Sequence, residues 1–501
     1  MTDPVGKLPP GHDPSRLPAR PDGLPTLSLC LIARNEASTL PRLLASVEGA
    51  FDEVILVDTG STDDTAALFR QWAGEETRRA AERGETFSHL LRSYEWQDDF
   101  AAARRYADSC ARGDWLAWAD CDDELYGAQH LRPLAAQAPA DVVALVASYD
   151  YAQDSNGRCV CRLKRERLVR RGCGTWEGRV HEAQSLAGNV QEIAPELVEW
   201  RHRKPADHGV TSNDRNLRIL RQWVKTDPTS TRVLMYLGTE ELTRGRAKQA
   251  ITWFRRYLKL EPGWTEERAQ VHRKLALAYM ATGQPGKAVQ TALEALRLMP
   301  QWPDSALSLA EAHYELREPD KAIYWAEQVL AAGVPDTMLI INPADYQCQP
   351  HVVLAGAYSA LGQLDQAIAH AEQALTVMPG HPAVAGPYQG WLATRKREHT
   401  ADTFLAAAEV LRAHDEQLKA LAVLESAPHY AVDHPRVVAA RSQLRERIIP
   451  LHDPASYADR YTSGGSKPED MVRDEDVLPL GDSLPRCGFL LRGLTELAEA
   501  A

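Results

Sequence analysis

The sequence predicts an α/β domain with a largely parallel sheet, followed by an all-helical solenoid. In the first half of the chain, short apolar runs alternate with helix-period segments, as in buried parallel strands joined by helices. From about residue 229 these runs stop, and small residues recur at fixed offsets, as in stacked helical hairpins. Polar residues cluster where the apolar runs end, and in open α/β sheets that edge binds ligands.

The composition excludes several classes of protein. The chain has 501 residues, of which 44% are hydrophobic and 25% charged, so bulk disorder and collagen-like structure are excluded. At about 150 residues per domain, the length predicts about three domains or one long array. The net charge of −12 disfavours a general binder of the nucleic-acid backbone, although a local basic patch stays open.

The sequence predicts no membrane association. No apolar run is long enough to span a bilayer, and the first residues lack the apolar core of a secretory signal. The eight cysteines are sparse for this length, so we expect a reducing compartment and a cytoplasmic protein rather than a disulfide scaffold.

Four apolar runs mark the expected strands of the first domain, at residues 27–33, 53–57, 115–119 and 141–147. Between the first two, leucine and valine recur at helical spacing over residues 38–47, which predicts a connecting helix. Residues 1–25 carry seven prolines and no apolar period, so we expect an extended leader there. The α/β domain then occupies residues 26–225.

The second half of the chain contains an internal repeat. Four alanines each follow another small residue by twelve positions, and glycine and proline keep fixed offsets in three of the four copies. The alanines are Ala250, Ala288, Ala322 and Ala367, and their small partners are Gly238, Ala276, Ala310 and Ala355. Small residues let antiparallel helices touch, glycine opens the turn, and proline ends the second helix. The pattern resembles the tetratricopeptide repeat, whose period is about 34 residues.

The repeat is irregular towards its end. The alanine spacings are 38, 34 and 45, and the last predicts an insertion near residues 336–350. A degenerate fifth repeat is predicted by Ala408, Ala420 and Ala427, which keep the same offsets. We therefore expect helical repeats over residues 229–450. Residues 451–501 turn polar and irregular, and the sequence assigns this tail no function.

Carboxylates at the strand ends are the strongest chemical signal. Asp120 and Asp122 are two residues apart in an extended segment, which places both side chains on one side. Hard cations such as Mg²⁺ take oxygen ligands, typically one or two carboxylates beside phosphate oxygens. The spacing is common by chance, but here it follows an apolar strand downstream of two others with polar ends. The pattern predicts a metal site that holds a diphosphate.

Six segments of the first domain form an ordered set of motifs. Three follow predicted strands: residues 31–36 (LIARNE), 57–65 (VDTGSTDDT) and 120–124 (DCDDE). The others are residues 99–104 (DFAAAR), the Trp176-x-Gly178-x-Val180-His181-Glu182 segment, and His202. Together they resemble the family 2 glycosyltransferases of the GT-A fold. The sequence departs from the family pattern at two points. Arg105 stands where the family has asparagine, and the H-x-G that usually follows the histidine matching His202 is absent.

The tryptophan-containing segment is typical of one bacterial and phage branch of that family. This branch includes the sublancin-type S-glycosyltransferases, which modify peptide cysteines, and in it such a domain also occurs fused to tetratricopeptide repeats. The resemblance therefore implies a GT-A domain followed by a tetratricopeptide-like solenoid.

The resemblance also implies a role for each matching donor-side residue. Asn35, Glu36 and Asp58 would bind a nucleoside-diphosphate sugar, with Asp58 at the base or ribose. Asp120 would hold the ribose or a divalent metal, Mn²⁺ or Mg²⁺, and Asp122 would ligate that metal.

The remaining matches imply the chemistry of transfer. His202 would complete the metal shell as a neutral imidazole, and Arg104 would neutralise charge on the leaving diphosphate and so contribute to donor binding. Glu182 is the candidate general base for in-line displacement with inversion, and His181 is its catalytic neighbour, which positions it. Two other carboxylates stay open as the base: Glu177 and Asp123.

A basic stretch over residues 158–171 holds seven Lys or Arg against one acid. Three interpretations stay open: a solvated strand pair, a contact to the diphosphate or acceptor, and a nucleic-acid patch. A zinc site is a separate alternative, although its C-x-C spacing is unusual. Its four ligands would be Cys159, Cys161, Cys173 and His181.

We therefore expect an inverting, metal-dependent glycosyltransferase joined to a helical platform for docking or homo-oligomerisation. Solenoids bind extended peptides and other proteins on their concave faces, so the expected acceptor is a protein or peptide. One alternative is a glycosyltransferase acting on modified bases of DNA, which the basic stretch would suit. Another is a non-catalytic repeat scaffold with a degenerate transferase domain, which Arg105 would suit.

Overall fold

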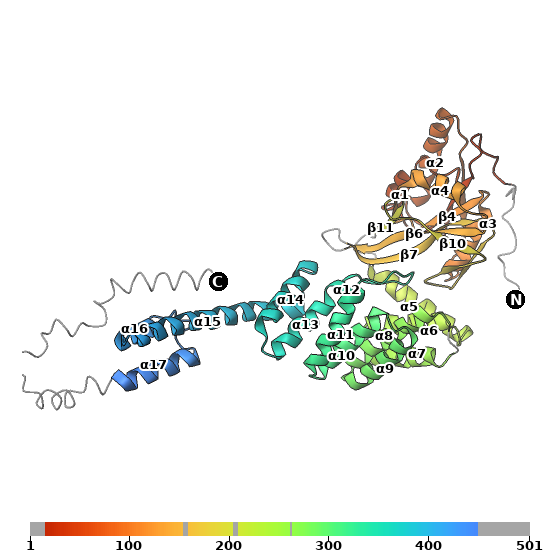
Figure 1. Cartoon of the computed structure of the whole chain (residues 1–501). Helices are drawn as coiled ribbons and strands as arrows, with labels where there is room; N and C mark the ends of the chain where they lie inside the picture. The colour runs from red at the N-terminus through yellow and green to blue at the C-terminus, as the bar shows by residue number, and fades with distance from the viewer. Residues whose placement is uncertain (1–15, 154–158, 204–208, 261–262, 449–501) are drawn as a thin grey trace, which may run out of the picture. The chain divides into compact units, whose positions relative to one another are not determined.

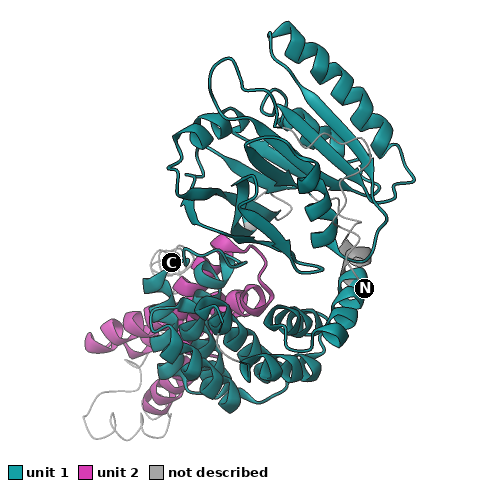
Figure 2. Cartoon of the chain, turned by 90° about the vertical axis from the view of Figure 1, so that its right-hand side faces the viewer, with its two compact units in different colours: residues 1–353 teal, residues 354–501 magenta. Residues whose placement is uncertain are grey.

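The computed structural model describes residues 16–153, 159–203, 209–260 and 263–448 (Figure 1). The chain divides into two units, residues 1–353 and 354–501 (Figure 2). The first unit holds a mixed α/β domain and the first helical repeats, and the second holds further helices. Residues 1–15 of the predicted leader and the predicted tail at 451–501 lie outside the described residues.

One large sheet organises the α/β domain. Its strand order is β3-β2-β1-β4-β7-β6-β11-β5, and β10 also pairs with β6. A separate hairpin pairs β8 with β9. The strands are β1 (Leu27–Ala33), β2 (Glu53–Asp58), β3 (Ser88–Ser93), β4 (Trp115–Ala119), β5 (Asp123–Tyr126), β6 (Val142–Gln153), β7 (Cys159–Arg170), β8 (Gly174–Glu177), β9 (Ala183–Leu186), β10 (Asn189–Glu192) and β11 (Glu199–His202).

The sheet is parallel in one half and mixed in the other. β1 pairs in parallel with both β2 and β4, and β2 pairs in parallel with β3. β7 runs antiparallel to β4 and to β6, which extends the sheet beyond this parallel half. The predicted parallel arrangement is therefore correct for the strands whose carboxyl ends carry the candidate site.

Helices cover both faces of the sheet. They are α1 (Leu40–Ser46), α2 (Thr65–Glu82), α3 (Phe100–Cys110), the short 3₁₀ helix η2 (Ala128–His130) and α4 (Leu131–Gln137). Successive strand residues point to opposite faces, so Leu29 packs in one cluster with Leu43 and Phe69, whereas Cys30 packs in another with Ala107. The sheet is thus buried on both sides, which explains its nearly continuous apolar runs.

The described end of the predicted leader lies against this domain. Residues 16–25 form no helix or strand. Arg20 donates to Asp52 at 2.6 Å and to Glu85 at 3.0 Å, and both contacts fasten the segment beside the start of the sheet.

The helical half begins with three antiparallel pairs, α6 with α7, α8 with α9 and α10 with α11. The helices of the first unit are α5 (Gly209–Thr226), α6 (Thr231–Thr243), α7 (Ala247–Leu258), α8 (Thr265–Ala281), α9 (Pro285–Leu298), α10 (Pro303–Glu315), α11 (Pro319–Ala332) and α12 (Ala344–Gln347), and α13 (Gln349–Ala360) follows. The four anchor alanines of the repeat are all fully buried. None of the described helices has the length and apolar content needed to cross a membrane.

The predicted insertion near residues 336–350 ties the repeats to the sheet domain. Residues 333–343, which include its first part, are called the strap below. Ile341 forms an antiparallel bridge with Arg162 of β7, and Leu339 is buried beside Trp302. Thr337 donates to Glu266 of α8 at 2.7 Å. The strap therefore contacts both the solenoid and the transferase-like sheet.

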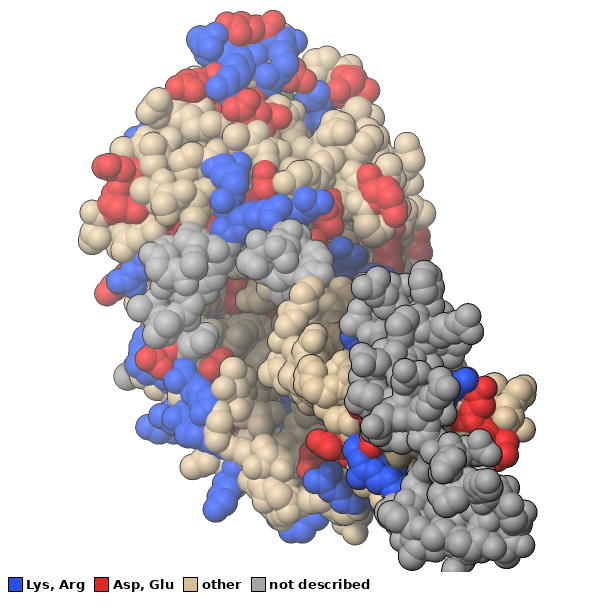
Figure 3. Space-filling view, turned by 90° about the vertical axis from the view of Figure 1, so that its left-hand side faces the viewer, with Lys and Arg blue, Asp and Glu red and all other residues tan. Residues whose placement is uncertain are grey.

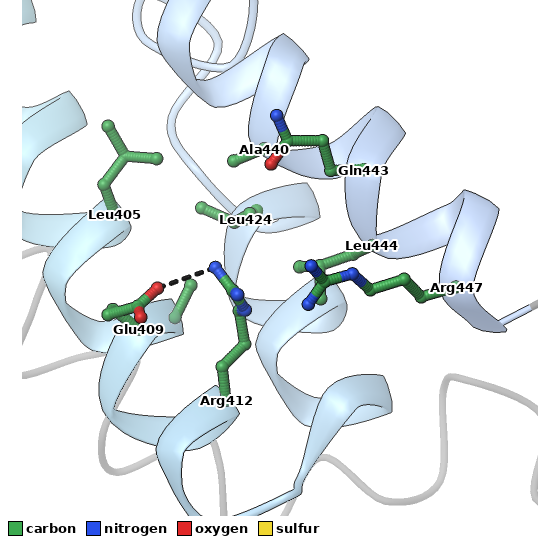
Figure 4. Close-up of a pocket in the computed structure, with 9 residues that line it drawn as sticks. Leu405, Glu409, Arg412, Leu424, Ala440, Gln443, Leu444 and Arg447 are labelled. Carbon is green, nitrogen blue, oxygen red and sulfur yellow. Dashed lines mark hydrogen bonds and ion pairs between the residues drawn. The ribbon is translucent and has the colours of Figure 1, made fainter.

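The second unit contains α14 (Leu364–Val377), α15 (Pro382–Ala413), α16 (Gln417–Glu425) and α17 (Pro435–Ile448). Ala408 and Ala420 of the predicted fifth repeat are buried in the cluster between α15 and α16. α15 is one continuous helix of 32 residues. Figure 4 shows a pocket among α15, α16 and α17, where Arg412 pairs with Glu409.

Gly238 offers a direct test of the repeat packing. A Cβ at this position would lie 2.3 Å from Cε1 of Phe254, so we expect Gly238→Val to lower the free energy of unfolding by about 1–3 kcal/mol. Thermal unfolding followed by far-UV circular dichroism measures this. Gly286→Ala is the control, because a Cβ there meets no atom within 4 Å. Equal melting of the two variants would contradict the close contact.

Candidate active site

The carboxyl ends of β1, β2 and β4 bring three motif loops to one edge of the sheet. In the parallel register, Ala33 lies beside Asp58, and Leu31 lies beside Ala119. Each strand is followed directly by polar residues, so Asn35, the loop after Asp58, and Asp120 gather at this edge. This is the edge at which open α/β sheets bind ligands.

Two of these loops are joined by hydrogen bonds. Asn35 lies in the left-handed region, and its side-chain oxygen accepts from the amide of Thr62 at 2.7 Å. Ser61 in turn accepts from the amide of Asn35 at 3.0 Å. Asp58 accepts from the amides of Gly60 and Ser61. Asn35 and Asp58 therefore shape the loop beside the predicted donor site, and donor contact stays a prediction for both.

A compact acidic cluster forms the centre of the edge. One ligand atom from each of Asp120, Asp122, Asp123 and His202 lies within 4.8 Å of the others. β11 runs antiparallel to β5 and places His202 opposite Asp123, although the two are far apart in sequence. The His202 ring stacks on Tyr151, with centroids 5.1 Å apart. The three residues predicted to hold the metal, Asp120, Asp122 and His202, thus lie in this cluster.

Asp123 is the most deeply buried residue of the acidic cluster. Its side chain is fully buried and accepts from Tyr149 at 2.7 Å and from Arg167 at 3.2 Å. It also accepts from the amide of Asp120 at 3.0 Å. With its oxygens engaged in this way, Asp123 holds the loop in shape, whereas Glu177, the other rival base, is exposed.

The cluster has an excess of negative charge. Burial raises the pKa of Asp122 to about 7, and the charges of Asp120, Asp123 and Glu36 add to the rise. Burial also acts to raise the pKa of Asp120, but the positive charges of Arg104, His202 and Arg167 together hold that pKa at about 2. Burial acts to lower the pKa of His202, but the hydrogen bond to Asp123 and the negative charges of the cluster together raise it. A divalent cation would relieve this excess, so the residues fit a metal.

Glu36 contributes to the same environment. Its carboxylate accepts from Thr39 at 2.5 Å, and its charge contributes to the raised pKa of Asp122. Glu36 therefore lies near the acidic cluster, in the loop just before the N-terminus of α1.

Arg104 connects the cluster to the second part of the site. Its Nη2 donates to Asp120 at 2.6 Å, and its Nε donates to Glu182 at 2.8 Å. The guanidinium lies 4.6 Å from the ring centre of Trp118 and 4.9 Å from that of Trp176. A buried Arg held by two carboxylates and two aromatic faces has one well-defined position.

Arg105 explains one departure from the family pattern. Its Nη1 donates to the backbone carbonyl of Trp176 at 2.6 Å. Trp176 also donates its indole N–H to Asp108 at 2.8 Å. Arg105 therefore helps to hold β8 beside Arg104.

His181 lies on the repeat side of the site. Its ring stacks on Tyr236 of α6, with centroids 4.2 Å apart, and its carbonyl accepts from Arg232. Burial and nearby positive charges lower its pKa to about 4, so the ring is neutral at physiological pH. This arrangement supports positioning of the adjacent Glu182 by His181, which remains the prediction for this residue.

The alternative zinc site is not formed. Cys159 and Cys161 begin β7, and Cys173 follows its other end, so roughly 30 Å of extended strand separates them. In the parts of the chain that the structure describes, the one detected group of metal-binding side chains is the Asp/His cluster.

Sequence reasoning did not predict the contacts that four side chains make in the site. They are Tyr149, Trp118, Arg167 and Tyr236. Arg167 occupies a buried position next to apolar strand residues, and this pattern is the one local signal that a buried partner exists. The other three are ordinary apolar or aromatic positions in the sequence.

Comparison with known families agrees with this arrangement. Residues 28–184 match the model for glycosyl transferase family 2, and residues 273–336 and 349–381 match models of the tetratricopeptide repeat. The chain carries a family 2 glycosyltransferase domain and tetratricopeptide repeats. The resemblance drawn from the motifs is thereby confirmed.

Curated relatives match parts of the chain. The SPbeta prophage-derived glycosyltransferase SunS of Bacillus subtilis is 23% identical over 255 residues, 49% of this chain and 56% of that protein. A TPR repeat-containing protein of Synechococcus elongatus is 44% identical over 99 residues, 20% of this chain and 21% of that protein. The chain thus spans about half or less of the length of these relatives.

Solved structures match the helical half at low scores. The structure of MamA is 20% identical, covers 33% of this chain and 88% of its own, and has a TM-score of 0.28. A thermophilic TPR protein of Thermus thermophilus is 21% identical, covers 37% and 93%, and has a TM-score of 0.29. Scores of this size do not establish a shared fold.

Asp122→Asn tests the metal cluster. We expect the variant to bind Mn²⁺ at least about tenfold more weakly than the parent chain, because a predicted oxygen ligand loses its charge. Isothermal titration calorimetry with MnCl₂ measures the affinity. Asp141→Asn, which changes an exposed carboxylate beside Asn189, is the control. Equal affinities of the two variants would remove Asp122 from the ligand set.

The same titration has an expected pH dependence. Because burial raises the pKa of Asp122 to about 7, protons compete with the metal at lower pH. We expect Mn²⁺ affinity to weaken as the pH falls from about 8 to about 6. An affinity that stays constant over this interval would contradict the raised pKa.

Proposed function

We propose that this chain is an inverting, metal-dependent glycosyltransferase that moves a sugar from a nucleoside-diphosphate sugar to a protein or peptide acceptor. The observation that carries the proposal is the Arg104 bridge. One guanidinium holds Asp120 of the acidic cluster and Glu182, the candidate base, at 2.6 and 2.8 Å. Arg104 therefore links Asp120, on the donor side of the predicted reaction, to Glu182, on its acceptor side.

On the donor side, Asp122 and His202 would hold the cation, Mn²⁺ or Mg²⁺. The metal supplies positive charge to a leaving nucleoside diphosphate. Arg104 adds a fixed positive charge next to Asp120, and it needs little rearrangement because two carboxylates and the rings of Trp118 and Trp176 hold it in place. The loop shaped by Asn35 and Asp58 provides polar groups for the nucleoside.

On the acceptor side, Glu182 would take the proton of the attacking group. The new bond forms between the acceptor atom and the anomeric carbon while the bond to the diphosphate breaks, which inverts the configuration. Arg104 holds Oε1 of Glu182, and no described residue donates a hydrogen bond to Oε2. The carboxylate is thus oriented and keeps one oxygen for the acceptor proton.

A protein or peptide acceptor is supported by the contact between the site and the repeats. His181, the neighbour of Glu182, stacks on Tyr236 of α6. A solenoid that reaches the residue beside the base can present an extended chain to it.

We also keep the cytoplasm as the proposed compartment, since every described cysteine is a free thiol.

The DNA alternative has lost its main support. Most cations of the basic stretch are already engaged within the protein. The carboxylate pairs are Arg162 with Asp150, Lys164 with Glu192 and Asp336, Arg165 with Glu166, and Arg167 with Asp123. Arg170 donates to backbone carbonyls. On the face drawn in Figure 3, Lys and Arg also alternate with Asp and Glu instead of forming one broad patch.

Donor hydrolysis is the first test. We expect slow release of nucleoside diphosphate from one member of a panel of UDP-, GDP- and dTDP-sugars, dependent on Mn²⁺ or Mg²⁺. Chelator and Asp122→Asn should both abolish the release, because the leaving diphosphate then lacks its counter-charge. Absence of both hydrolysis and donor binding across the panel would favour the non-catalytic scaffold instead.

Glu182→Gln tests the base once a donor is known. We expect sugar transfer to fall by about 10²–10⁴-fold while donor binding persists, because the amide cannot accept the proton but still accepts from Arg104. Glu177→Gln, at an exposed position of β8, is the matched control. If Glu177→Gln lost transfer and Glu182→Gln did not, the two roles would be exchanged.

A further inference from the structure

Four cations surround the point at which the repeats meet the candidate site. They come from β7, α5, α6 and α8 and are called the cation set below: Arg165, Arg215, Arg232 and Lys274. After burial, their positive charges are the causes that lower the pKa of His181. They therefore lie near the residue next to Glu182, although they come from distant parts of the sequence.

Among the residues that the structure describes, three of the four cations have no carboxylate partner, since no carboxylate oxygen there lies within 4 Å of the charged nitrogens of Arg215, Arg232 or Lys274. Lys274 donates to the hydroxyl of Thr239 at 3.1 Å, and Arg232 donates to the carbonyl of His181. Arg215 lies 4.9 Å from the ring centre of Phe100. The paired cations of the neighbouring strand β7 show that this chain elsewhere supplies acids to its cations.

The unpaired charge of Lys274 is unfavourable for the fold. Lys274 is partly buried, and burial lowers its pKa to about 8. Removing a charge from water without a partner destabilises a protein, so ordinary packing would favour a neutral residue at this position. A negatively charged ligand that pairs with these cations would explain why they lie beside a candidate active site.

The cation set lies on the acceptor side of the proposed reaction. Asp120, Arg104 and Glu182 form a line of contacts, with the acidic cluster at the Asp120 end. Arg165 begins the cation set by donating to the backbone carbonyl of Glu182 at 3.1 Å. Arg232 and Lys274 continue it on the repeat helices α6 and α8. The donor diphosphate is expected at the acidic cluster, which leaves these cations for the acceptor.

Two separate contacts hold the repeats in position. At one end, His181 and Phe100 pack against residues of α5 and α6. At the other, the strap forms its bridge with β7, and Gln270 of α8 donates to the strap carbonyl of Ile340 at 3.0 Å. The cations are thus held in place before a ligand arrives, which reduces the entropy cost of binding.

We propose that the cation set binds acidic side chains of the acceptor, so that the preferred acceptor is a peptide segment with Asp or Glu close to the modified residue. This rests on the proposed glycosyltransferase function and names its acceptor class. A nucleic acid fits less well, because a phosphate backbone needs a continuous row of cations, which Glu240 and Glu267 interrupt, whereas one or two acidic side chains need only local contacts.

Peptide binding without donor tests the proposal. The probe is a short fluorescein-labelled peptide in which Glu and Asp alternate with Ser and Thr, and its partner has Gln and Asn in place of the acids. Fluorescence anisotropy at low salt should show roughly tenfold tighter binding of the acidic peptide to the full chain. Equal affinity for the two peptides would overturn the proposal.

Variants assign the effect to the cation set. Arg215→Ala with Lys274→Met should weaken binding of the acidic peptide by about tenfold, whereas Arg215→Lys with Lys274→Arg should retain it. The matched control is Lys248→Met with Arg255→Ala, which removes two exposed cations of α7. Equal losses in the double variant and the control would overturn the proposal, since the effect would then be general charge.

Two further outcomes separate this proposal from its rivals. Single-stranded DNA of the same charge should displace the peptide poorly, and efficient displacement would overturn the proposal in favour of a nucleic-acid ligand. Because binding is measured without donor, a chain that binds the acidic peptide but releases no nucleoside diphosphate would retain the cation set as a peptide site. In that case the proposed function fails on its own.

Discussion

The buried guanidinium of Arg104 is the constraint on which the site depends. It separates Asp120 from Glu182 and attracts both, and without it two carboxylates would face each other in a poorly solvated space. The rings of Trp118 and Trp176, which are nearly perpendicular to each other, both pack against it. Removing one member of a buried ion pair leaves an uncompensated charge, so Arg104 and its two carboxylates depend on one another.

The same logic extends to the basic strand. Arg167 reaches Asp123 beneath the acidic cluster, and Tyr149 donates to the same carboxylate. The loop that carries Asp120 and Asp122 is therefore supported from below by a neutralised carboxylate. Arg167 belongs to the basic stretch in the sequence, but in the structure it neutralises the buried Asp123 and does not remain available for a ligand.

The repeats are part of the site's surroundings and do not form an independent appendage. α6 contributes Tyr236 to the stack with His181, and the strap reaches β7 from the other end. This explains why His181 adopts the left-handed backbone conformation, since its ring and its carbonyl are both held by α6. In the proposed function, these contacts would connect acceptor binding by the solenoid to chemistry at Glu182.

The sequence by itself determined the elements and the motif residues at the sheet edge. Apolar runs mark β1, β2 and β4, and small residues such as Gly238 mark helix contacts, because burial and periodicity are local properties. Only the tertiary structure decided which distant residues meet. It brings His202 to Asp123, Arg167 beneath the acidic cluster, and the four residues of the cation set close to His181. Those contacts depend on long-range strand order and domain packing, which no local pattern encodes, and the charge balance of the site follows from them.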